Sequence, residues 1–173
     1  MKKSIWMLGL SLVLLITFGI NVQAQPKEVT ESGVTTYYVT SKVLPLEEGG
    51  LYMSYEAIGV NVNDTGEGLF HNATIRVLGG MKIEKGIYKD ERSWGVWNLQ
   101  NGDKVFLTYR GTGEVKPEGV GIAKGTTTIT GGTGKCAGIQ GTFDITRYTP
   151  RSAVAVQVGG LSYTKGTIKY KLP

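Results

Sequence analysis

The feature that most constrains this chain is a series of short segments in which apolar and polar residues alternate, separated by glycine-rich turns. In residues 104–110, Val105, Leu107 and Tyr109 fall on one side of the segment. The other side carries Lys104, Phe106, Thr108 and Arg110. A period of two is that of a β-strand with one buried face. Beyond residue 24, no segment carries a sustained apolar stripe with the helical period. The chain is therefore expected to be all-β.

The strands are predicted from alternation, from β-branched and aromatic content and from the turn signals between them. The predicted segments are 34–40, 51–62, 69–78, 81–88, 94–99, 104–111, 119–130, 141–148, 153–158 and 161–171. The strongest hairpin signal is Asn101-Gly102 between two of them. About eight to ten short strands at regular spacing indicate a sandwich or a barrel. Glycines inside strands, such as Gly59 and Gly95, favour the bends that a closed barrel needs.

The first 24 residues have the pattern of a secretory signal peptide. Lys2 and Lys3 form a basic start, residues 4–20 are mostly apolar, and 22–24 (V-Q-A) form a small-x-small cleavage site. The alternative is a membrane anchor, but an apolar stretch of roughly 16 residues is short for a spanning helix. We expect an exported protein, periplasmic or extracellular, without an integral membrane segment after cleavage. Residues 25–33 are expected to be a flexible polar tail before a barrel domain at 34–173.

The composition excludes several classes of protein. One cysteine and one histidine cannot build a zinc finger, an iron–sulfur centre or a disulfide framework, so neither a metal site nor a cofactor is implied. The net charge is +5, and the basic residues are spread along the chain rather than gathered in a nucleic-acid-binding arm. No nucleic-acid partner is expected.

The most distinctive segment is 131–143, which reads G-G-T-G-K-C-A-G-I-Q-G-T-F. A phosphate-binding loop would carry Ser or Thr after the Gly-Lys pair, whereas this chain has Cys136. The segment is instead predicted to be a tight connection between two strands, with glycines at positions of positive φ. Cys136 is expected to be a buried filler; the alternative is an exposed thiol that forms an intermolecular disulfide.

This segment resembles the G-G-T-G-K-(aromatic)-x-G-x-x-G segment of the allene oxide cyclase and dirigent-like barrels, with Cys136 in the aromatic position. Three further segments resemble a group of exported bacterial proteins without an assigned activity: 66–76 with L-F-H-N, 101–113 with G-D-K-V, and the tail 164–173. The resemblance implies a single calycin-like antiparallel β-barrel of about eight strands. It also implies a homo-oligomer, a dimer or trimer. No catalytic residue of a cyclase matches one for one, so none is carried over.

His71 and Glu56 are the candidates for chemistry. His71 alternates with Ala73 and Ile75 and is predicted to face the interior, where it would need a partner or a ligand; the alternative is a structural or rim histidine. Glu56 lies mid-strand, and an inward carboxylate would have a raised pKa and could act as a base. Its alternative is a solvent-facing side chain. Arg76 and Arg110 are its candidate partners.

The aromatic residues complete the candidate site. Trp94 and Trp97 are three positions apart in one strand, so they are predicted to lie on opposite faces, one of them in the core. The ligand-binding candidates are His71, Glu56, Tyr109, Trp97 and Arg110.

Three functions remain open from the sequence. The first is a binding protein for a small apolar or aromatic molecule in or at the mouth of the barrel, which requires an unfilled interior. The second is a non-catalytic interaction module of the cell envelope, which an exposed aromatic patch would favour. The third is an isomerase- or cyclase-like enzyme, which requires His71 and Glu56 to reach one cavity with Tyr109. Of the three, the sequence favours the enzyme least.

Overall fold

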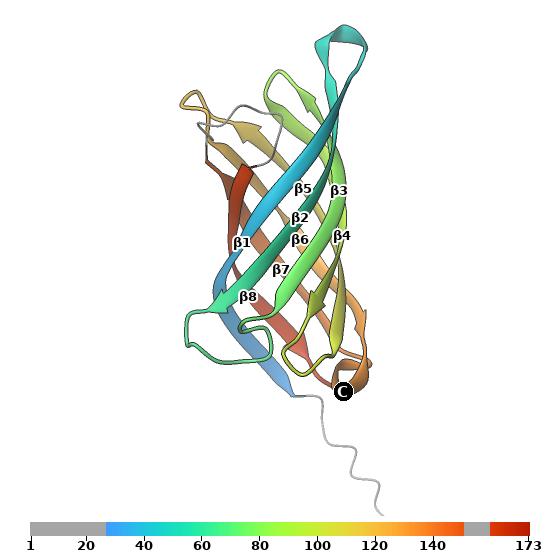
Figure 1. Ribbon diagram of the computed structural model, residues 1–173, viewed down its shortest axis with the longest axis vertical. Coiled ribbons are helices and arrows are strands. Elements are labelled where there is room, and N and C mark those ends of the chain that lie inside the picture. The colour runs from blue at the N-terminus through green and yellow to red at the C-terminus, as the bar shows by residue number, and fades with distance from the viewer. Residues whose placement is uncertain (1–26, 151–159) are drawn as a thin grey trace, which may run out of the picture.

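The computed structural model describes residues 27–150 and 160–173, and within them the chain forms a closed antiparallel barrel of eight strands (Figure 1). The strands are β1 (Glu28–Pro45), β2 (Leu51–Asn63), β3 (Thr74–Glu84), β4 (Ile87–Asn98), β5 (Lys104–Val115), β6 (Gly121–Gly132), β7 (Gln140–Thr149) and β8 (Gly160–Lys171). Two 3₁₀ turns, η1 (Glu47–Gly49) and η2 (Gly134–Cys136), lie in connections. The all-β barrel predicted from the sequence is confirmed. The signal segment 1–24 and the strand expected at 153–158 lie outside the described residues.

The barrel closes between its first and last strands. β1 pairs with β8 from Glu28 opposite Lys171 to Val39 opposite Gly160. The flexible tail expected at 25–33 is therefore wrong from residue 28 onward, because those residues are part of β1. The tail was predicted from the polar composition of these residues. They form a strand nevertheless, because their backbone groups pair with β8 and leave it without a free edge.

The third predicted strand was placed too early. Residues 69–73 form a loop, and β3 begins at Thr74 and runs without a break through Gly79 and Gly80. The chain turns at Lys85 and Gly86, with φ of 49° and 78°, which is the left-handed geometry of a tight hairpin. A register shift between Gly80 and Lys82 marks a β-bulge in this strand pair.

One end of the barrel is filled by an aromatic plug of Phe70, Trp97, Phe143 and Tyr170. The ring centroids of Phe70 and Trp97 are 4.4 Å apart, those of Phe70 and Tyr170 5.2 Å, and those of Trp97 and Phe143 6.1 Å. The β2–β3 loop, the β4–β5 turn and η2 all lie at this end, as does the carboxyl terminus (Figure 1). The turn at Asn101-Gly102 joins β4 to β5 as predicted.

The glycine-rich segment is the tight β6–β7 connection that was expected. Gly134 has a φ of 54°, and a Cβ there would lie 1.8 Å from the Asp103 carboxylate, so any other residue would be strained and would displace that side chain. Asp103 also accepts a hydrogen bond of 3.0 Å from the backbone N–H of Lys135. Cys136 is buried beside this turn, which confirms the filler interpretation and leaves no exposed thiol for a disulfide. Burial, helped by Asp103, raises the pKa of its thiol.

Candidate functional site

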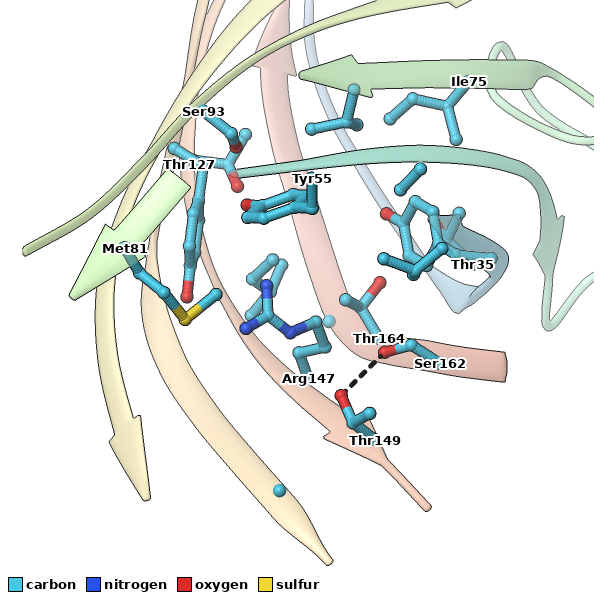
Figure 2. A pocket seen from close by; sticks show the side chains of 18 of the residues that line it. Thr35, Tyr55, Ile75, Met81, Ser93, Thr127, Arg147, Thr149, Ser162 and Thr164 are labelled. Atoms are coloured by element: carbon cyan, nitrogen blue, oxygen red, sulfur yellow. Dashed lines mark hydrogen bonds between the residues drawn. The ribbon is translucent and has the colours of Figure 1, made fainter. Parts of the chain in front are cut away.

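Above the plug, the barrel interior holds a cavity of about 610 Å³. Inward side chains from all eight strands line it, because alternate residues of each strand face the interior. The lining extends from Trp97 and Phe143 at the plug to Val115, Gly119 and Pro150 at the opposite end. Most of the wall is apolar or aromatic, with threonine and serine hydroxyls between (Figure 2).

A buried ion pair lies in the wall of this cavity. Arg147 on β7 binds the Glu91 carboxylate on β4 with both terminal nitrogens, Nη1 to Oε1 and Nη2 to Oε2, the latter at 2.9 Å. The Glu91 side chain is 0% exposed, whereas that of Arg147 is 16% exposed toward the interior. Burial alone lowers the pKa of Arg147, but the adjacent Glu91 carboxylate outweighs burial and leaves the pKa raised. The guanidinium is therefore charged and held in a fixed orientation.

Two tyrosines complete the polar group. The Tyr55 hydroxyl donates a hydrogen bond of 2.7 Å to Glu91 Oε1, and the Arg147 guanidinium lies 5.9 Å from the centroid of the Tyr55 ring. The Tyr109 hydroxyl is buried and has no hydrogen-bond partner among the described residues. Burial, with a contribution from the Glu91 charge, raises the pKa of Tyr109 to about 12.

The cavity stays open because its tyrosines lie against glycines in the wall. A Cβ on Gly79 would lie 2.7 Å from the Tyr55 hydroxyl, and a Cβ on Gly111 only 2.0 Å from the Tyr109 hydroxyl. These glycines leave the space in which each ring lies along the wall rather than across the interior. A side chain at either position would push the tyrosine ring away from the wall and into the cavity.

Gly79→Ala is expected to displace Tyr55 from the wall and break its hydrogen bond to Glu91. The contacts on that Cβ are side-chain atoms of Ser93 and Tyr55, so the ring moves and the strands stay paired. We expect a loss of about 1–3 kcal/mol in the free energy of unfolding, measured by urea denaturation. Gly160→Ala is the control, because a Cβ there meets no described atom within 4 Å. Equal stability of the two variants would contradict this role for Gly79.

The raised pKa of Tyr109 predicts a loss of stability in alkali. The folded-state pKa, about 12, is above the ordinary value of 10.0, so the contribution is complete below pH 10 and is lost as pH rises through 12. A shift of this size corresponds to about 2–3 kcal/mol. Urea denaturation between pH 9 and pH 12 should show this decline, and the decline should be shallower for Tyr109→Phe. Identical slopes for the two proteins would contradict the assignment.

The structure brings only part of the predicted site together. Tyr109 and Trp97 line the cavity as expected. Glu56 does not, because it lies on the outer face, where Arg76 donates a hydrogen bond of 2.7 Å to it; the solvent-facing alternative and the Arg76 partner are both confirmed. Arg110 is also wrong as a ligand-binding residue, since it lies on the exposed outer face of β5.

His71 is likewise wrong as an interior residue. It lies in the β2–β3 loop, half-buried, and its Nδ1 accepts a hydrogen bond of 3.2 Å from the backbone N–H of Asn63. Alternation placed His71 inward only because the strand was assumed to begin at Leu69. The structural role that was its alternative is the one observed.

The two most important residues of the cavity, Glu91 and Arg147, were missed. The sequence carried a signal for both: Glu91 continues the inward series of Ser93 and Trp97, and Arg147 continues that of Phe143. The predicted strands ended at residue 88 and began again at residue 94, so residues 89–93 were left unassigned. The structure continues β4 through this run by a bulge at Asp90, whose φ is 51°.

No family model matches the chain, and no curated protein matches it. Within 27–150 and 160–173, no group of three or more His, Cys, Asp or Glu side chains is placed to hold a metal ion. The same residues contain no helix long and apolar enough to cross a membrane.

Proposed function

We propose that this chain is an exported protein that binds a small, largely apolar or aromatic ligand inside the barrel. The observation that supports this is the cavity of about 610 Å³, which lies within the range of about 300–1,000 Å³ typical of small-molecule sites. Its wall combines a wide apolar surface with a few convergent polar groups, the usual composition of such sites. We include in this proposal that the chain is related to the allene oxide cyclase and dirigent-like barrels, which segment 131–143 resembles.

The enzyme hypothesis loses its geometric premise. It required His71 and Glu56 to reach one cavity, and neither lines the cavity described here. A second candidate, an interaction module of the cell envelope, is favoured by a specific observation. Tyr38 lies directly opposite Leu161 on one side and Ile58 on the other, and these three outward side chains are 51%, 70% and 57% exposed, a contiguous apolar group of the kind found at contact surfaces. Sedimentation or light scattering of the purified protein would test self-association through that face.

The binding function is tested by native mass spectrometry of the protein purified from its compartment without refolding. We expect a reproducible bound mass, and apolar ligands should raise the melting temperature, because a ligand that binds only the folded state stabilises it by about 2.7 kcal/mol at a hundredfold excess over Kd. Ala57→Phe fills the cavity and should abolish both effects. Ile58→Phe is the matched control, since the next side chain along the strand points outward. The absence of both effects in the unaltered protein would overturn the proposal.

A further inference from the structure

The charge on the cavity wall is balanced before any ligand arrives. Arg147 is the single charged side chain among the described residues that line the cavity. Its positive charge is matched by Glu91, which lies behind it with no exposed surface. Figure 2 shows Arg147 reaching into the interior near Tyr55 and Met81. The N–H donors of Arg147 therefore face the cavity, while the Arg147–Glu91 pair as a whole has no net charge.

Hydrogen-bond donors remain unused in this interior. A guanidinium has five N–H donors, and Glu91 takes two of those of Arg147. No other acceptor for Arg147 is found in the described part of the chain. Unpaired buried donors cost free energy, so an acceptor brought into the cavity would be favoured.

An anionic acceptor does not suit this site. A carboxylate placed against Arg147 would share that cation with Glu91 and leave one uncompensated negative charge in an apolar interior, and such burial is strongly unfavourable. A cation is repelled by the Arg147 charge, and the Glu91 carboxylate that could balance it is covered. A neutral oxygen accepts the free N–H groups without adding a charge.

Resting on the proposed binding function, we propose that the ligand is an uncharged molecule with an apolar body and a carbonyl oxygen, or an equivalent neutral acceptor, that binds Arg147. The apolar body of the ligand occupies the cavity between the aromatic plug and the opposite end of the barrel. The Arg147–Glu91 pair makes the site selective for neutral acceptors over carboxylates. Glu91 is then a positioning residue that sets the charge preference through Arg147.

The test uses four probes that share one skeleton: 2-acetylnaphthalene, 2-ethylnaphthalene, 2-naphthoate and 2-naphthylmethylammonium. Their affinities are measured by fluorescence titration of the ligand-stripped protein. We expect the ketone to bind about 10- to 100-fold more tightly than the hydrocarbon or the carboxylate, since hydrogen bonds to a charged donor have about this effect.

Glu91→Gln provides the decisive variant. It keeps an acceptor for Tyr55 and leaves the Arg147 charge unbalanced, so the carboxylate should gain at least about tenfold in affinity and approach or exceed the ketone. A double variant, Glu91→Gln with Arg147→Met, removes both charges and should bind ketone and hydrocarbon equally. It also keeps the test usable if the single variant does not fold, as judged by circular dichroism.

The outcomes separate the two proposals. If the hydrocarbon binds as tightly as the ketone, or the carboxylate binds best to the unaltered protein, the neutral-acceptor inference is overturned and the binding function stands. If none of the four probes binds and none raises the melting temperature, the binding function itself is overturned.

Discussion

Arg147→Met is expected to lower the free energy of unfolding by about 3–5 kcal/mol. The substitution leaves Glu91 as a carboxylate with no exposed surface and no cation, and the Tyr55 hydroxyl is then its one hydrogen-bond donor in the described part of the chain. A buried charge that loses its partner retains the full cost of desolvation. Urea denaturation at neutral pH measures the loss.

The double variant Glu91→Gln with Arg147→Met should recover most of that loss. Both charges are then gone, and an apolar side chain of similar length replaces the guanidinium, a change that is often neutral for a buried pair. A double-mutant cycle of the four proteins gives the coupling energy. The control is Arg76→Met, since its pair with Glu56 is exposed and should be worth less than about 1 kcal/mol. A double variant as unstable as Arg147→Met would show that lost packing, not charge, causes the effect.

The strands could largely be predicted from the sequence because alternation reports directly which face is buried. Trp97 is buried and Trp94 exposed, as their odd spacing predicted. The prediction failed where the chain departs from alternation. A bulge at Asp90 puts both Tyr88 and Glu91 on the inner wall, although they are three positions apart. Strict alternation of every second residue would place them on opposite faces, so it fails at this point.

The site was harder to predict than the fold because its partners are far apart in sequence. Glu91 and Arg147 are separated by 56 positions and meet only across the interior of the closed barrel. Each is an ordinary surface residue when considered alone, and charged residues are buried only when paired. Local pattern cannot supply the pairing, since a strand pattern carries no information about which strand lies opposite.

Whether the interior is open or packed also depended on contacts that composition does not contain. Tyr109 and Tyr55 are large enough to fill a small barrel, and the sequence allowed either result. The rings lie on the wall because Gly111 and Gly79 are placed beneath them.

Phe70→Ala is expected to lower the free energy of unfolding by about 3–5 kcal/mol, the range for truncating a buried aromatic residue. Phe70 has no exposed surface and contacts the rings of Trp97 and Tyr170 at the centre of the plug. Phe106→Ala is the matched control, since that ring lies on the outer face with 38% of its surface exposed, and should cost less than about 1 kcal/mol.

The effect at Phe70 should fall toward the upper end of this range because the loop that carries it cannot move into the space left by the ring. The Glu31 carboxylate accepts hydrogen bonds from the backbone N–H groups of Leu69, at 2.8 Å, and Phe70, at 3.2 Å. It also accepts from the Tyr170 hydroxyl and the Asn63 amide, so the loop is fixed from several sides. A cavity that the surroundings cannot close retains its full cost. A loss below about 2 kcal/mol would show that the loop collapses onto the plug, and Glu31→Gln combined with Phe70→Ala would then add little further destabilisation.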